Sequence, residues 1–222
     1  MNNLLPTDYQ TFIATSRYAR WLDEQGRREN WGETVERYMD NVVAPLLTEE
    51  TDWTTYDELS EAILGLGVMP SMRALMTAGP AATRDNTCMY NCSYLAVDHL
   101  RAFDEAMHIL LCGTGVGFSV ERQSISKLPE VPELFQSETN IVVKDSKEGW
   151  AEAFRQLIAL LYSGAIPKWD VSSVRPAGAR LKVFGGRASG PAPLVDLFNF
   201  TIAIFKKASG RKLNSVECHD IM

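Results

Sequence analysis

The sequence lacks several features that would assign it to a familiar class of protein. Its 222 residues include no run of about 18 consecutive apolar residues, which excludes a membrane-spanning helix. Residues 1–10 have neither the basic start nor the apolar stretch of a secretory signal peptide. Four unevenly spaced cysteines do not form the pattern of a disulfide scaffold. These absences favour a protein of the reducing cytoplasm.

The chain also lacks an overall positive charge, since its formal net charge is −6. The charge is uneven, because residues 166–215 carry nine basic and two acidic side chains while residues 1–165 are acidic. This distribution does not suit a protein that coats DNA or RNA. The basic segment is compatible with binding a small polyanion such as a nucleotide, although charge alone favours a merely solvated basic face.

The first part of the chain has the pattern of a helical domain. Apolar residues recur at three- and four-residue spacing in residues 8–26 and 30–47, which predicts two helices. Residues 54–57 offer helix-start residues for a third helix, which should end at the glycines that follow. Because residues 1–65 contain no histidine or cysteine, we expect a small helical cap without chemistry of its own.

The pattern changes in residues 66–126. Residues 69–88 are rich in proline, glycine, threonine and asparagine and should be extended or looped. A short strand, CSYLAV, then precedes a helix, HLRAFDEAMHILLC, whose apolar stripe consists of Leu100, Phe103, Met107, Leu110 and Leu111. A glycine turn leads into a further strand, GTGVGFSVER. The order strand, helix, strand is that of a crossover in an α/β sheet.

Residues 127–222 begin with a proline-broken linker. A short strand is predicted at 140–145, followed by a helix that Ser146 caps and Gly164 closes. Residues 167–193 should form a loop with several basic side chains, and 194–210 a last apolar helix. The chain then stops at NSVECHDIM in a way that suggests an interruption.

Three features of the middle region could carry chemistry. Cys92 follows Asn91 at a strand start, where a thiol could project into a cleft, although a cysteine is more often inert packing. The glycines of 113–117 come after a helix and before a strand, which excludes a dinucleotide fingerprint. They permit either close approach of a ligand or merely a tight turn. Asp98 could cap the following helix or accept a hydrogen bond from a ribose hydroxyl.

A zinc site is a rival interpretation of the same region. Cys88 and Cys92 precede His108 and Cys112, and two ligand pairs at such spacing could hold a zinc ion. The intervening residues form an ordinary strand and helix, whose apolar side chains must pack into a core. We therefore predict no metal, and keep a structural zinc as the less favoured alternative.

Five segments together resemble one family. They occur in the same order in ribonucleotide reductases of the monomeric, adenosylcobalamin-dependent class II, and they are MYNCSYLAVD, DEAMHILLCGTGVGFSVE, DSKEGWAEAF, VRPAGARLKVFGGRASGP and SGRKL with CHDIM. The resemblance implies the amino-terminal portion of a split or truncated enzyme. Its α/β fold would comprise a helical cap (1–65), part of a ten-stranded barrel (66–126) and a mainly helical insertion (127–222).

The resemblance implies an activity, the reduction of ribonucleoside triphosphates to 2′-deoxyribonucleotides. Cys92 follows Asn91 as the family's first redox cysteine does, so it would donate hydrogen to the 2′ carbon and end each turnover in a disulfide. A thioredoxin-like reductant would restore the thiol by exchange. The partner cysteine, the radical-bearing cysteine and most contacts to adenosylcobalamin are expected beyond Met222. Activity would then need a complementary C-terminal reductase chain.

The resemblance also implies nucleotide contacts. Substrate contacts are expected from five positions, Ser71, Asn91, Gly115, Gly117 and Ser119. Contacts to a deoxynucleoside-triphosphate effector are expected from Asp98 and from three basic residues suited to phosphate, Arg175, Lys182 and Arg187. Two other functions remain open, a non-catalytic nucleotide-binding regulatory module and a zinc-stabilised interaction domain.

Overall fold

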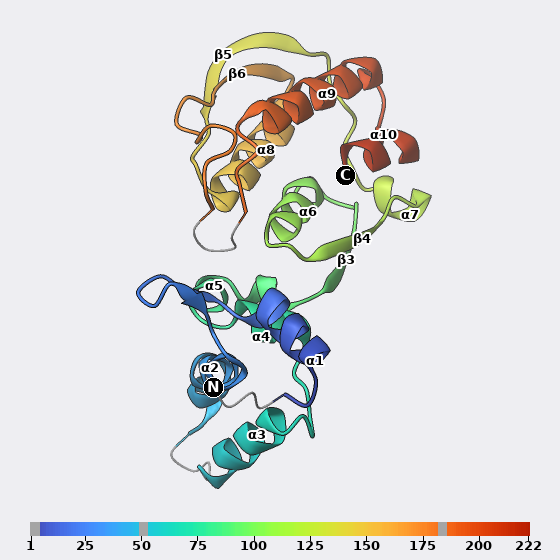
Figure 1. Cartoon of the computed structure of the whole chain (residues 1–222). Coiled ribbons are helices and arrows are strands. Elements are labelled where there is room, and N and C mark those ends of the chain that lie inside the picture. Colours follow the sequence, from blue (N-terminus) through green and yellow to red (C-terminus); the bar gives the residue numbers. More distant parts are fainter. Residues whose placement is uncertain (1–4, 49–52, 182–185) are drawn as a thin grey trace. The chain divides into compact units, whose positions relative to one another are not determined.

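The computed structural model describes residues 5–48, 53–181 and 186–222. The chain divides into two compact units, Met1–Asn91 and Cys92–Met222, both drawn in Figure 1. No helix in these described ranges is long and apolar enough to cross a bilayer.

The first unit is built of short helices around one apolar cluster, to which Trp31, Met39 and Leu75 belong. An asparagine at position 30 opens the second helix with a capping box, in which its side chain and that of Glu33 each accept the other's backbone N–H. The elements are α1 (Asp8–Ile13), a π-helical turn (Ala14–Tyr18), α2 (Trp31–Tyr38), a second π-helical turn (Met39–Val43), a 3₁₀ turn (Ala44–Leu46), α3 (Thr54–Leu64), α4 (Met72–Thr77), α5 (Pro80–Arg84) and a 3₁₀ turn (Asn86–Met89).

Two expectations for the first unit are wrong. The helix predicted over 8–26 ends at Tyr18, and a small antiparallel hairpin of β1 (Trp21–Leu22) and β2 (Arg27–Arg28) follows. Gly26, with φ of 63°, makes the hairpin turn possible. The region predicted to be extended contains α4 and α5 instead, because its serine and proline start helices: Ser71 caps α4, and Pro80 occupies the first turn of α5.

The second unit begins with the predicted crossover. Strands β3 (Cys92–Ala96) and β4 (Gly115–Ser119) are parallel, and α6 (Ala102–Leu111) connects them. Phe103 of α6 is buried as expected. The predicted apolar stripe is only partly buried, however, since Leu110 and Leu111 are exposed and lie outside the core cluster to which Phe103 belongs.

A second parallel pair follows a short helix, α7 (Arg122–Ile125). Strands β5 (Phe135–Val142) and β6 (Ala165–Asp170) are joined by α8 (Lys147–Tyr162), which packs with α9 (Ala192–Ala208) in one core, and the last helix is α10 (Ser215–Ile221). The helix predicted after Ser146 is confirmed, with the Ser146 hydroxyl accepting a hydrogen bond from the Gly149 N–H. The loop predicted from residue 167 is partly wrong, because these residues form much of β6 and pair with β5.

The predicted mixture of helices and strands is confirmed, but a barrel is not seen. Within the described residues the strands form three separate sheets of two strands each. The region expected to be a mainly helical insertion contains the parallel pair β5–β6 as well as helices. The division at residues 65 and 126 remains a prediction.

Candidate functional site

The parallel pair β3–β4 presents one open face. Side chains alternate along a strand, so the residues paired in register as Cys92 with Gly115 and Tyr94 with Gly117 share one face. These four positions are exposed, and Tyr94 is 70% exposed. The opposite face, which carries Leu95 and Phe118, packs against the core of the second unit. The open face therefore carries a thiol and a phenol beside two positions without side chains.

Cys92 differs from the other cysteines in its surroundings. All four cysteines are free thiols, and Cys88, Cys112 and Cys218 are buried whereas Cys92 is exposed. Burial raises the pKa of the Cys218 thiol to about 12, which removes that group from thiol chemistry near neutral pH. Cys92 is thus the cysteine that a substrate or an external thiol could reach.

The glycines of β4 leave the backbone beside Cys92 accessible. A β-carbon placed on Gly117 would meet only the carbonyl oxygen of Ser93, at an ordinary contact distance of 3.7 Å. Packing within the chain therefore does not require glycine at this position. The tight-turn function belongs instead to Gly113, whose φ is 82°. The bare backbone at Gly117 would allow close approach of a ligand, which remains a prediction.

The other predicted substrate contacts have different surroundings. Ser119 lies at the end of β4, where its hydroxyl donates to the Glu121 carboxylate over 3.3 Å. Ser71 and Asn91 belong to the first unit, and the Ser71 hydroxyl accepts a hydrogen bond from the Ala74 N–H that caps α4. The structure thus gathers four of the predicted residues on one strand pair: Cys92, Gly115, Gly117 and Ser119.

Asp98 does not cap the following helix, because the residue at that position is Arg101. Its carboxylate instead accepts hydrogen bonds from Lys127 Nζ over 2.8 Å and from His99 Nδ1 over 2.9 Å. These two donors, Lys127 above all, lower the pKa of the Asp98 carboxyl. The group is a partly exposed, ionised acceptor, as a contact to ribose hydroxyls requires.

The basic residues predicted to bind effector phosphates are partly engaged within the chain. Arg175 donates through Nε to both carboxylate oxygens of Asp145, over 3.0 and 2.8 Å, and thereby joins the segments that follow β5 and β6. Arg187 is exposed and donates to the Gly178 carbonyl over 2.9 Å. Lys182 lies outside the described residues. The effector role of these three side chains remains a prediction.

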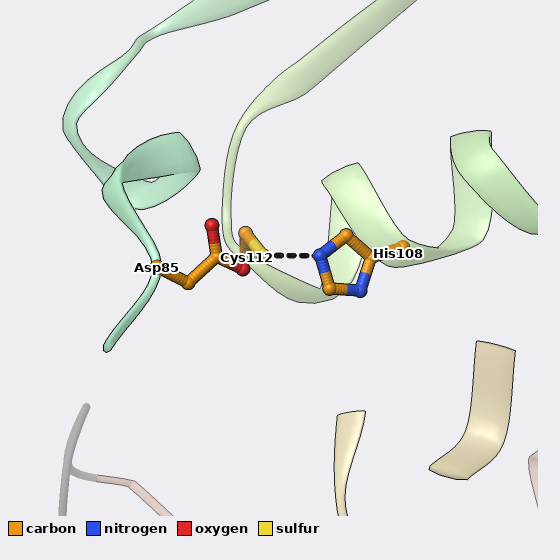
Figure 2. A group of neighbouring side chains, drawn as sticks. All are labelled: Asp85, His108 and Cys112. Atoms are coloured by element: carbon orange, nitrogen blue, oxygen red, sulfur yellow. Dashed lines mark hydrogen bonds between the residues drawn. The ribbon is translucent and has the colours of Figure 1, made fainter. Parts of the chain in front are cut away.

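His108 of α6 and Cys112, which follows the last residue of that helix, lie together, as their spacing predicts. His108 Nε2 and Cys112 Sγ are 3.7 Å apart, and the dashed line in Figure 2 marks this contact. Asp85, also drawn there, belongs to the first unit. Among the described residues of the second unit no third histidine, cysteine or carboxylate joins this pair, whereas a structural zinc takes four ligands. Lys147 Nζ also donates to the same sulfur over 3.0 Å, and an ammonium there opposes a metal ion.

The sequence interpretation missed two residues, Tyr94 and Lys147. Tyr94 could have been found, because the strand period of two places it on the face of Cys92. Lys147 could not, since its contact with Cys112 joins residues that are 35 apart in the chain.

Comparisons with known proteins agree on one group of enzymes. Residues 127–204 match the family model "B12-dependent ribonucleotide reductase, insertion domain". An adenosylcobalamin-dependent ribonucleoside-triphosphate reductase of Lactobacillus leichmannii is 30% identical over 92% of this chain and 36% of its own length. That of Levilactobacillus brevis is 29% identical over 92% and 37%.

A solved structure is similar as well. The crystal structure of a B12-dependent (class II) ribonucleotide reductase matches 95% of this chain and 38% of its own, with a TM-score of 0.83 and 27% identity. The chain thus spans little more than a third of the length of the relatives that it matches.

Proposed function

Since the chain belongs to the B12-dependent (class II) ribonucleotide reductase family, as expected from the sequence, we propose that it supplies one redox thiol and part of a nucleotide-binding region to a ribonucleoside-triphosphate reductase. The rest of the enzyme, in the same polypeptide or in a complementary chain, would add strands to β3 and β4 and complete the ten-stranded barrel. The enzyme would act in the cytoplasm, with a thioredoxin-like reductant.

The open face of β3–β4 is the observation that carries this proposal. It combines an exposed thiol with glycine positions at which a ligand can approach the backbone. A thiol sealed in the core could not reach a bound ribonucleotide. We therefore assign the redox role to Cys92 and the contacts beside it to Gly115, Gly117 and Ser119, with Asn91 and Ser71 as further substrate contacts.

The proposed chemistry needs a second thiol from the rest of the enzyme. In the overall reaction two thiols lose two hydrogen atoms, the ribose loses its 2′-hydroxyl as water, and a disulfide forms. Cys92 would give its hydrogen to the 2′ carbon, and the sulfurs must then approach to about 2 Å. An external dithiol would reverse the disulfide by exchange. An exposed position suits Cys92 to both steps.

Effector binding is the second part of the proposal. The ionised carboxylate of Asp98 would accept hydrogen bonds from the sugar of a deoxynucleoside triphosphate. Arg187, an exposed side chain that donates to the Gly178 carbonyl, and Lys182 would then meet the phosphates. Arg175 would first have to give up some or all of its hydrogen bonds to Asp145, so we expect it to contribute least to phosphate binding.

Adenosylcobalamin, the proposed cofactor, would supply the radical that starts the reaction. We assign none of its contacts to the described residues. The three histidines already have neighbours within the second unit: His99 binds Asp98, His108 lies beside Cys112, and His219 packs on the Phe118 ring.

Replacement of Cys92 tests the proposal. We expect Cys92→Ser, combined with the rest of the enzyme and adenosylcobalamin, to lose dithiol-dependent formation of deoxyribonucleotide over repeated turnovers by at least 100-fold. Nucleotide binding should be retained, because serine is nearly isosteric. The matched control is Cys218→Ala, which removes a buried thiol far down the chain from the open face and should keep dithiol-dependent turnover.

Three results would contradict the assignment. Full turnover by Cys92→Ser would show that another thiol carries the redox step. A chain that binds nucleotides but never supports reduction, whatever completes it, would be a regulatory module instead. Stoichiometric zinc in the purified chain would favour the zinc-stabilised interaction domain.

A further inference from the structure

A second group of reactive side chains lies where α6 meets α8. Cys112 follows the last residue of α6, and Lys147 is the first residue of α8. Lys147 Nζ donates to Cys112 Sγ over 3.0 Å, and His108 Nε2 lies 3.7 Å from the same sulfur. The proposed reductase function uses none of these three residues.

The surroundings of the sulfur restrict what it can react with. Cys112 is 1% exposed, so bulky thiols and protein disulfides cannot reach it while the second unit is folded. A molecule as small as hydrogen peroxide can enter through local opening of the packed helices. Peroxides oxidise the thiolate form of cysteine. Any oxidised sulfur formed here then has an amine beside it.

We propose that Cys112 and Lys147 form an oxidation-dependent covalent bridge in which one oxygen atom links Sγ to Nζ. The separation of 3.0 Å supports a bridging oxygen, because a direct sulfur–nitrogen bond would require both atoms to move much closer. Both side chains also leave helix ends whose packing already holds them in place, since α6 and α8 contact each other.

The reaction balances with hydrogen peroxide as the oxidant. A thiol, a neutral amine and two peroxide molecules give the bridge and three water molecules. Sulfur and nitrogen each lose two electrons, and each peroxide is reduced to water. Lys147 must release its ammonium proton for the nitrogen to react, and the imidazole of His108 is placed close to the sulfur to accept a proton. Two dithiol molecules, each oxidised to a disulfide, reverse the bridge to thiol, amine and water.

The bridge would tie two parts of the second unit together. Helix α6 connects β3 to β4, and α8 connects β5 to β6. A covalent link between the end of α6 and the start of α8 would therefore hold the strand pair of Cys92 against the segment 127–204. This inference does not depend on the reductase activity.

Peptide mass spectrometry of the peroxide-treated chain tests the proposal. We expect trypsin to release residues 102–122 joined to 145–155, because a bridged Lys147 is no longer cleaved. The joined peptides should weigh one oxygen more and two hydrogens less than their sum. The product should disappear after treatment with dithiothreitol.

Two variants provide the controls. Lys147→Arg keeps a cation beside the sulfur but has no primary amine, so the bridge should be lost while circular dichroism stays unchanged. Cys218→Ala should leave the bridge intact. The proposal is overturned if Cys112 forms only sulfinic acid or a disulfide, if it stays unmodified while Cys92 is oxidised, or if Lys147→Arg still yields the joined peptides.

Discussion

Two arginines of the first unit make ion pairs of similar length in different surroundings. Arg37 contacts Glu29 at 2.8 Å with both side chains largely buried, and it also donates to the carbonyls of Tyr18, Leu75 and Ala78. Arg27 contacts Glu33 at 2.7 Å near the surface. Removal of a buried partner leaves a charge without compensation, whereas an exposed pair is screened by water.

We therefore expect Arg37→Met to lower the free energy of unfolding by about 3–5 kcal/mol. The matched variant Arg27→Met should lower it by less than about 1 kcal/mol. Urea titration followed by circular dichroism measures both. Equal losses in the two variants would mean that burial does not set the strength of these pairs.

Two acids of the second unit, the buried thiol of Cys218 and the partly buried phenol of Tyr162, make it sensitive to alkali. Burial raises the pKa of Cys218 from 9.0 to about 12, and burial likewise raises the pKa of Tyr162 above its ordinary 10.0. Above these ordinary values the unfolded chain loses a proton that the folded chain keeps. Stability is thus fully present below pH 9 and falls as the pH rises from there.

The expected slope is at most about 1.4 kcal/mol per pH unit for each group. Unfolding of the chain between pH 8 and pH 11 measures this slope. Cys218→Ala and Tyr162→Phe should each flatten it. A slope that is the same in the parent and in both variants would place the alkaline sensitivity elsewhere.

At the scale of elements, the sequence predicted correctly those helices and strands whose first and last residues are marked by local signals such as a capping residue or a glycine. The Ser146 cap and Gly164 stop delimit α8, and β3, α6 and β4 follow their predicted order. Strand β6 was missed because it is formed by pairing with β5, which precedes it by more than 20 positions. Its own residues include a proline and charged side chains, a pattern that predicts a loop. The barrel could not be tested from local patterns at all.

Glycines in two elements should respond differently to the same substitution. A β-carbon on Gly149 would lie 2.6 Å from both the Cβ and the carbonyl oxygen of Lys144, so the first turn of α8 depends on glycine. We expect Gly149→Ala to cost about 1–3 kcal/mol of stability. Gly117→Ala should leave thermal unfolding nearly unchanged, and should lower substrate reduction if β4 lines the substrate site. Equal destabilisation by the two substitutions would contradict this distinction.

At the scale of the molecule, each unit has its own apolar core. The candidate site followed from the sequence only in part. The motif around Cys92 identified the thiol, but its exposure and its register opposite Gly115 depend on a pairing across 23 positions that no local pattern contains. The ion pairs that engage Asp98 and Arg175 likewise join distant segments, and no local pattern predicts them.

The two-stranded sheets have a practical consequence. In the described ranges β3 and β4 bond only to each other, so each keeps a side along which amide and carbonyl groups have no strand to bind. Unpaired strand edges of this kind readily pair with further strands, and in a closed barrel every edge would be paired. The polypeptide purified alone at high concentration should therefore self-associate. Co-expression with the part that supplies the neighbouring strands should prevent this self-association.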